Sequence, residues 1–525
     1  MTNKLCIQTM INDFTVPFVL FLLHHHSHKN ISLAQRRMMM KKQLSVAPTP
    51  KLTSTSKSTP MPVWISDEEL DPAWLQDVLK DPSIIRASVK DISNATRRGD
   101  KTKDGATLKV TIVRERQYSD DADDDVVPLP DTMVLKQTLC TPKGFQMSRS
   151  LGLAREALFC KHLAPKMNKV KELTSIPTIY YAHGDMETGE KIVLMEDLSS
   201  STQRYVDSGI LFGPGNPNNW KRDLNGMITK EYGNDHKDTC RDTDIEVASS
   251  DQKAHRSPPS GEKVAHITFK AIARVHARFW TDASLINDDS SWLRGSNWIQ
   301  GQGEDAWNAS QGYIRGIYEG GIDDKLESWD PLVKATLDHA MAGISWQAQL
   351  ERLNTGEQCN WTLVHGDFWP GNVLISTDVT SDNNNNDNDD APSSTVNNEG
   401  LDETGSLRIL DWEMVGIGSG PQDVGQYILS NMSIEERRGC EERVVRGYWE
   451  ELVRNGVDSL SFPWEECWRE YRIGGVERFL WFLVHFCGQP DGSPLLKWGQ
   501  FFHDQIAAFL KDHDLKPTDF VQPRP

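Results

Sequence analysis

Two short segments constrain the fold of this chain more than any other feature. The first, residues 361–375, is an apolar run that leads into His365, Asp367 and Asn372. The second is another apolar run, and it ends at Asp411. A carboxylate can orient a hydroxyl and accept its proton, and carboxylate and amide oxygens are good ligands for Mg²⁺. Because each group follows a predicted strand, the pattern favours a site built for phosphoryl transfer.

The spacing of these residues resembles the catalytic loop and the metal-binding turn of kinases. The chain has His-Gly-Asp at 365–367, then Asn372, and Asp-Trp-Glu at 411–413. In this form it resembles the aminoglycoside phosphotransferase and choline-kinase-like families more than the protein kinases. The resemblance implies that Asp367 is the base and that Asn372 and Asp411 bind Mg²⁺. It implies transfer of the γ-phosphoryl group of ATP to a hydroxyl of a small-molecule acceptor.

The same resemblance implies an α+β, two-lobed protein-kinase-like fold, with a small antiparallel-sheet N-lobe and a mainly helical C-lobe. It extends from about Ser83 to Leu510 and is interrupted by two inserts. Four parts are predicted. They are a leader (1–62), an N-lobe with a preceding helix (63–198), a variable insert (199–263) and a helical C-lobe that holds the catalytic loop (264–520). Within the C-lobe, residues 376–406 are acidic and low in complexity, which predicts a disordered insert.

The first residues have an unusual composition. Residues 14–66 contain no Asp or Glu, and they are rich in Lys, Arg, Ser and Thr. This composition is typical of an organelle transit segment, and a disordered leader explains it equally well. The dispersed cysteines favour a reducing compartment, so we expect a cytoplasmic protein and leave organelle targeting open.

The N-lobe should contain a buried ion pair. Residues 83–95 and 107–117 alternate like strands, and the apolar strand 133–137 contains Lys136. A lysine within such a strand is costly unless its charge is paired, and Glu156 in the helix 153–163 is the predicted partner. By resemblance, Lys136 would hold the α- and β-phosphates and Glu156 would orient it. The alternative is an edge-strand lysine with its amine in water.

Two further N-lobe segments can be related to the nucleotide only through the resemblance. The apolar strand 192–198 corresponds to the hinge, where backbone groups of Glu196 and Leu198 would meet adenine. The basic turn 96–105 would cover the phosphates, although it lacks the glycine-rich pattern. A solvated hairpin tip explains that turn equally well.

Helix signals are strongest in the C-terminal half. A capping box predicts a helix from Ser433, and helices are also expected over residues 264–280, 463–487 and 494–510. A capping box at Ser66 predicts the helix that precedes the N-lobe. Residues 416–420 are read as a glycine-rich loop before a helix, and the resemblance gives Asp423 the task of supporting the catalytic-loop backbone.

One helical face could contact the acceptor. Glu477, Trp481 and His485 fall four residues apart, so they either line the acceptor pocket or belong to the core. His276, in the helix 264–280, is interpreted as a core histidine and not as a catalyst.

Composition excludes some classes of function. The formal net charge of −18 argues against a nucleic-acid partner, whose phosphates would be repelled. The eight cysteines are dispersed, which argues against a zinc site, and no apolar run reaches the length of a membrane span. The alternatives to a small-molecule kinase are a catalytically inactive, kinase-like protein that binds a nucleotide or metabolite, and an interaction module carried by the acidic inserts. The identity of the acceptor and the oligomeric state stay open.

Overall fold

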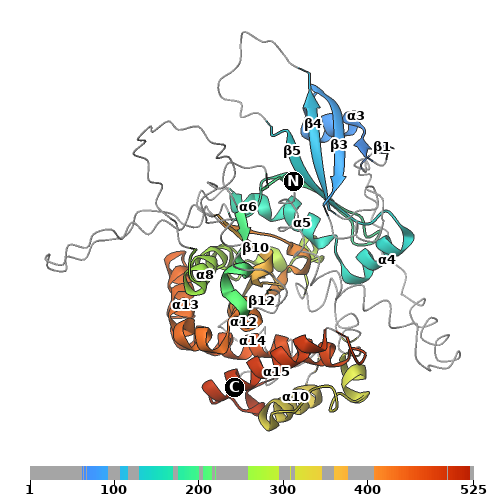
Figure 1. Cartoon of the computed structure of the whole chain (residues 1–525). Coiled ribbons are helices and arrows are strands. Elements are labelled where there is room, and N and C mark those ends of the chain that lie inside the picture. The colour runs from blue at the N-terminus through green and yellow to red at the C-terminus, as the bar shows by residue number, and fades with distance from the viewer. Residues whose placement is uncertain are drawn as a thin grey trace, which may run out of the picture. The chain divides into compact units, whose positions relative to one another are not determined.

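The structure is a computed structural model with helices and antiparallel sheets (Figure 1). It describes residues 62–92, 107–115, 129–168, 175–199, 205–215, 258–294, 314–343, 360–376 and 407–520, without 63, 67 and 494 and with the single positions 219, 308, 312 and 345. Contacts divide the chain into two units. Unit 1 comprises Met1–Ala157 and Ile179–Glu196, and unit 2 comprises Leu158–Thr178 and Asp197–Pro525.

Unit 1 is built on one antiparallel sheet of seven strands in the order β1-β2-β3-β4-β5-β7-β6. The strands are β1 (Trp64–Ser66), β2 (Glu69–Leu70), β3 (Ile84–Asp91), β4 (Thr107–Arg114), β5 (Thr132–Gln137), β6 (Ile179–Gly184) and β7 (Lys191–Glu196). In β5, Met133, Leu135 and Gln137 are buried, whereas the residues between them are partly exposed. This alternation places Lys136 on the face opposite Leu135. Strands β3, β4 and β5 confirm the strands expected around residues 83–95, 107–117 and 133–137.

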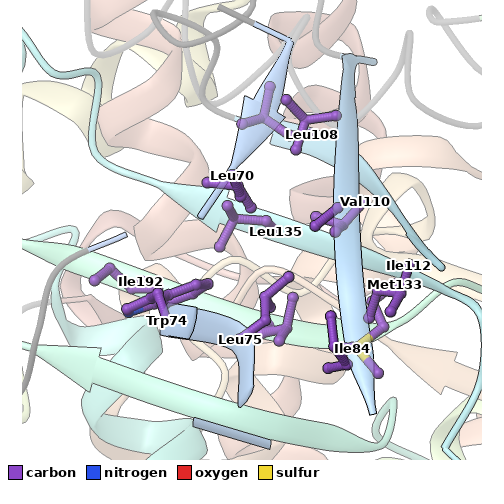
Figure 2. Packing of buried hydrophobic residues seen from close by; sticks show 13 residues of the cluster. Leu70, Trp74, Leu75, Ile84, Leu108, Val110, Ile112, Met133, Leu135 and Ile192 are labelled. Atoms are coloured by element: carbon purple, nitrogen blue, oxygen red, sulfur yellow. The ribbon is translucent and has the colours of Figure 1, made fainter. Parts of the chain in front are cut away.

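Helix α3 (Pro72–Leu79) covers one face of this sheet. Figure 2 shows Trp74 and Leu75 of this helix in one cluster of apolar side chains with strand residues such as Ile84, Met133 and Ile192. The other helices of this part of the chain are α4 (Pro142–Leu151), α5 (Arg155–His162) and α6 (Ala164–Asn168). The boundary between the units falls inside α5, after Ala157.

The predicted start of the first helix is wrong. Ser66 belongs to β1, and Leu70 pairs with Ala87 of β3, so the backbone of this segment is used in the sheet. The helix begins at Pro72, where the Asp71 side chain accepts a hydrogen bond from the Ala73 amide. It ends at Lys80, whose left-handed conformation stops it before Pro82.

Unit 2 is mainly helical. Its longer helices are α8 (Gly261–Arg278), α10 (Pro331–Gly343), α12 (Gly420–Asn431), α13 (Ile434–Arg454), α14 (Trp464–Cys487) and α15 (Leu496–Asp512). Short 3₁₀ segments are η4 (Ser208–Gly215), η6 (Ala283–Ile286), η7 (Asp288–Ser290), η8 (Pro370–Asn372), η11 (Trp412–Met414) and η12 (Pro517–Asp519). The expected cap of α13 is confirmed, because the Ser433 hydroxyl accepts from the Glu436 amide at 3.2 Å.

Two small antiparallel sheets lie among these helices. β10 (Val373–Ser376) pairs with β11 (Leu407–Ile409) on one side and with β8 (Tyr205–Asp207) on the other. β9 (Trp361–Val364) pairs with β12 (Gly416–Ser419). The prediction of a loop over residues 416–420 is therefore wrong. Glycine is usually depleted in strands, but a Cβ on Gly416 would lie 2.3 Å from the Arg294 carbonyl oxygen, so this strand needs a residue without one.

Helices α12 and α14 approach each other through glycines. A Cβ built on Gly475 would lie 2.9 Å from the Gly425 Cα, and one built on Gly425 would lie 2.7 Å from the Gly475 Cα. Both neighbouring atoms are backbone, so neither can move aside without separating the helices. This contact fixes how α14 lies against α12.

Gly475→Ala should therefore destabilise the protein despite the higher helix propensity of alanine. The matched control is Gly439→Ala in α13, where a Cβ would meet nothing within 4 Å. Because both variants gain the same propensity, the difference in their unfolding free energies isolates the overpacking, which we expect to be about 1–3 kcal/mol. Denaturant titration measures this difference, and equal stability of the two variants would contradict the contact.

Several predictions concern residues that the structure does not describe. They are the leader up to residue 61, the turn 96–105, residues 377–406 of the insert predicted over 376–406, and most of the insert 199–263. Ser376 itself belongs to β10. In the helices that are described, none has the length and apolar character needed to cross a membrane.

Candidate functional site

The catalytic-loop segment leaves β9 through a tight turn at Gly366. Gly366 has φ of 78°, and a Cβ there would lie 2.2 Å from the Met414 carbonyl oxygen. The Asp423 carboxylate holds this turn, because it accepts hydrogen bonds from the amides of His365 at 2.7 Å and Gly366 at 3.1 Å. The predicted role of Asp423 as a support of the loop backbone is confirmed in this geometry.

Buried histidines fix the turn and its support. His365 Nδ1 accepts from the Asp367 amide at 3.2 Å, so the ring proton lies on Nε2, which faces the Leu410 carbonyl at 2.9 Å. His276 is fully buried, lies 3.4 Å from Asp423 and bonds to the Tyr448 hydroxyl. This confirms the interpretation of His276 as a core residue. Burial opposes ionisation of Asp423, but the nearby His276 and the hydrogen bonds from the loop lower its pKa below the ordinary value.

Asp367 projects from this turn and is held by two amides. Its Oδ1 accepts from the Gln426 side chain at 3.2 Å, and its Oδ2 accepts from Asn372 Nδ2 at 3.3 Å. Burial raises the pKa of Asp367, and the charge of Asp411 adds to this rise, while Arg478 and His365 oppose it. A carboxylate with a raised pKa is a better proton acceptor than an ordinary aspartate, which suits a general base.

Asn372 and Asp411 are brought together by strand pairing. Val373 pairs with Ile409 in the β10–β11 ladder, and the Leu410 amide donates to the Asn372 carbonyl at 2.8 Å. Asp411 follows directly with φ of 65°, in the left-handed region that Asp tolerates better than most residues. Both side chains are buried, at 0% exposure for Asn372 and 5% for Asp411.

These two residues fit a hard cation. Asn372 Nδ2 donates to the carbonyl and the carboxylate of Asp367, which turns the amide oxygen Oδ1 away from that carboxylate. In the part of the chain that the structure describes, this buried oxygen has no hydrogen-bond partner. An amide oxygen and a carboxylate are the donors that Mg²⁺ prefers, so the predicted ligands Asn372 and Asp411 are chemically suitable.

Unit 1 contains the predicted ion pair. Lys136 Nζ lies 2.5 Å from Glu156 Oε1, which confirms the predicted partner. Lys191, on β7, donates to the other oxygen of Glu156 at 3.1 Å, and all three side chains are largely buried. Burial alone would raise the pKa of Glu156, but the two lysines outweigh it and hold that pKa well below its usual range.

Lys191 was not found from the sequence. Lys191 is the first residue of β7, two residues before Val193. In the adjacent strand β5, Lys136 is the residue that pairs with Val193. Residues i and i+2 of a strand point to the same face, so the pairing register would have revealed it.

The two predicted hinge residues lie where the chain passes between the units. Glu196 is the last residue of β7 and pairs with Met133, and it belongs to unit 1. Leu198 is buried and belongs to unit 2. Between them, the Asp197 carboxylate accepts from the Ser199 amide at 3.0 Å, which forms a tight turn. Their predicted backbone contacts with adenine stay a prediction.

Three residues that the sequence did not indicate also surround Asp367. One is Gln426, one turn after Asp423 on α12, and the others are Arg294 and Arg478, whose charges interact with that of Asp367. Of the face predicted for acceptor contact, Glu477 and Trp481 are partly exposed and His485 is buried. Burial lowers the pKa of His485 to about 4, as expected for a core histidine.

Comparison with known proteins gives only distant similarities. No family model matches the chain, and no curated protein sequence matches it. Solved structures with similarity to it include the choline kinase LicA from Streptococcus pneumoniae, at 11% identity and a TM-score of 0.32, covering 82% of this chain and 96% of that one. An ethanolamine kinase from Plasmodium vivax has 10% identity and a TM-score of 0.35, covering 82% of each chain.

A third similar structure is a microcompartment-associated aminopropanol kinase, at 11% identity and a TM-score of 0.32, covering 85% of this chain and 99% of that one. Each of the three is described as a small-molecule kinase. TM-scores of this size indicate nothing about function, whereas the residues of the site have a chemistry of their own.

Proposed function

We propose that this protein is an ATP-dependent phosphotransferase that moves the γ-phosphoryl group to a hydroxyl of a small-molecule acceptor. The observation that carries the proposal is the arrangement of the Asn372 side chain beside Asp367. Its nitrogen donates to the Asp367 carboxylate, and its buried oxygen has no partner among the described residues. One side chain can therefore orient a base and bind a cation, as phosphoryl transfer to a hydroxyl requires.

In the proposed reaction, Asp367 orients the acceptor hydroxyl and takes its proton. The hydroxyl oxygen forms a bond to the γ-phosphorus, and the bond from that phosphorus to the oxygen bridging to the β-phosphate breaks. The electron pair of the broken bond leaves with ADP. Mg²⁺, when bound with ATP, neutralises charge on the phosphates, and Asn372 and Asp411 would hold it. Gln426 and Asn372 keep the carboxylate in position, and Asp423 keeps the loop in position.

Unit 1 would supply the nucleotide-binding part of this enzyme, and the two units would be its two lobes. Lys136 is proposed to contact the α- and β-phosphates, and Glu156 to keep it in position. The backbone at Glu196 and Leu198 is proposed to meet adenine.

The test is an ATP-consumption screen of the purified full chain against hydroxyl-bearing small molecules. ADP formation is measured with and without each compound, in the presence of Mg²⁺, and the phosphorylated product is identified by mass spectrometry. We expect at least one compound to stimulate ADP formation and to gain one phosphoryl group. Binding of ATP without any transfer across the screen would instead favour the catalytically inactive, nucleotide-binding alternative.

A further inference from the structure

Two arginines of unit 2 lie near the loop that carries Asp367, and neither forms an ion pair to it in the described part of the chain. Arg294 bonds to Met414, whose carbonyl oxygen would lie 2.2 Å from a Cβ on Gly366. Arg294 directly precedes the segment whose placement is not described, and Arg478 lies on α14. The charge of Asp367 acts on both arginines, and the two guanidinium groups act on each other. Burial, together with repulsion from Arg478, lowers the pKa of Arg294 to about 10, so Arg294 still carries its charge at neutral pH. Burial also lowers the pKa of Arg478, and the charges of Asp367 and Asp423 oppose this shift.

Neither guanidinium group has a carboxylate partner in the described part of the chain. Arg294 Nη1 donates to the Met414 sulfur at 3.4 Å, which is a weak acceptor. The Arg478 guanidinium carbon lies 5.4 Å from the centre of the Phe482 ring, and its Nε is buried with no hydrogen-bond partner among the described residues. Partly buried arginines normally have an anionic partner, because their five donors need acceptors.

The nearby acids are already used by other groups. Asp423 accepts from two backbone amides of the catalytic loop, and Asp367 accepts from the side chains of Gln426 and Asn372. Because these carboxylates hold the loop and the base, donors of Arg294 and Arg478 stay available for a bound molecule.

The packing of α14 explains why Arg478 lies on the side of the base. Gly475 meets Gly425, and a Cβ on Gly474 would lie 3.2 Å from the Gln422 side chain, so this face of α14 packs on α12. Arg478 is four residues after Gly474 and three after Gly475, so it lies on the same face of α14, one turn further along the helix. Gln426 is four residues beyond Gln422 on α12, and its amide bonds to Asp367. The glycine contact therefore holds Arg478 against the part of α12 that carries Gln426, next to Asp367.

We propose that Arg294 and Arg478 bind an anionic group of the acceptor, so that the substrate is a hydroxyl compound carrying a carboxylate or a phosphate. This rests on the proposed function, because it concerns the molecule whose hydroxyl meets Asp367. The γ-phosphate of ATP is the other source of negative charge. We assign the arginines to the acceptor because both lie beside the base. Arg294 bonds to Met414, whose carbonyl packs against the Gly366 turn next to Asp367, and Arg478 follows the glycines of α14 that pack on α12, whose Gln426 bonds to Asp367. Two guanidinium groups also disfavour an ammonium group in the same place.

The first experiment compares three probes that share a three-carbon hydroxyl chain. They are 3-hydroxypropanoate, 3-hydroxypropanamide and 3-aminopropanol, and ligand-observed NMR measures their binding to the full chain without nucleotide. We expect the carboxylate to bind at least about tenfold more tightly than the amide and the amine, since charge-assisted bonds to arginine are about twice as strong as neutral ones. Equal affinities, tighter binding of the amide or the amine, or no binding of the carboxylate would overturn the proposal.

The second experiment uses Arg478→Gln and Arg294→Gln, with Arg443→Gln as the matched control. Arg443 is exposed and pairs with Glu262, away from Asp367. We expect each of the first two variants to weaken binding of the carboxylate by about 30-fold, and Arg478→Lys to restore part of it. Unchanged carboxylate affinity in both variants would overturn the assignment. Melting temperatures show whether each variant is folded.

Steady-state kinetics then separate the two sources of negative charge and the two proposals. A higher KM for the acceptor with an unchanged KM for ATP supports the acceptor subsite, whereas a rise confined to ATP overturns it. If wild-type protein phosphorylates only neutral or cationic alcohols, the proposed phosphotransferase function stands and the anionic subsite is wrong. If the carboxylate binds through the arginines but nothing is phosphorylated, the phosphotransferase function fails and the anion-binding site stands.

Discussion

Replacing Asp367 by Asn is expected to lower kcat by about a hundred- to ten-thousandfold, the usual contribution of a positioned acid–base group. Asn has the shape of Asp and can still accept a bond from Gln426 or Asn372, but it cannot take a proton from the acceptor. ATP binding and the melting temperature should therefore change little. The measurement is ADP formation with the acceptor found in the screen, together with direct ATP binding.

The control for this variant is Asp504→Asn. Asp504 is an exposed carboxylate on α15 with no part in the site, so its loss should leave kcat within a factor of about two, in line with small surface effects. Near-wild-type turnover of Asp367→Asn would remove Asp367 as the base. It would leave the fold and the nucleotide assignment untouched.

Replacing Asp411 by Asn should remove most of the dependence of nucleotide binding on Mg²⁺. The left-handed backbone at Asp411 makes Asn a better replacement than Ala, because Asn tolerates this conformation and the change then removes charge alone. We expect turnover to fall by on the order of a hundred- to a thousandfold, the typical effect of removing one group that stabilises the developing charge. The measurements are ATP titrations with and without Mg²⁺ and turnover across a range of Mg²⁺ concentrations.

A second substitution controls for packing at this position. Asp411→Ala removes the oxygen ligand as well as the charge and should be at least as inactive, with some loss of stability from the left-handed backbone. If Asp411→Asn shows the same response to Mg²⁺ as the wild-type protein, the assignment of Asp411 as a metal ligand is wrong.

Much of the fold could be predicted because its segments carry local signals. The strands around Val110, Leu135 and Val193 alternate or are continuously apolar, and the helix from Ser433 carries its own cap. The Lys136–Glu156 pair could also be predicted, since a lysine within an apolar strand needs a partner. Local signals failed where tertiary contact decided the outcome. Ser66 and Glu69 have the spacing of a cap, but the backbone around them pairs in a sheet.

The parts of the site that were missed depend on contacts between distant segments. Arg294 and Asp367 are far apart in the sequence, and no local pattern relates them. Arg478 directly follows Glu477, yet adjacent residues on a helix point in directions about 100° apart, so the face of Glu477, Trp481 and His485 gave no indication of Arg478. Gln426 is the exception. It lies three residues after Asp423 on α12, and helical spacing alone could have placed both on the side of the catalytic loop.

The bridging of Glu156 by two lysines has a practical consequence for trapping the substrate. Truncating one member of a buried ion pair usually costs about 3–5 kcal/mol, because the other charge is left unpaired. Here, removal of Lys136 leaves Glu156 bonded to Lys191, so the carboxylate keeps a cation at hydrogen-bond distance. The protein can therefore lose its proposed phosphate contact without exposing the core of unit 1 to an unpaired charge. A folded Lys136→Met protein could then be used to capture the unknown acceptor from a metabolite mixture by affinity.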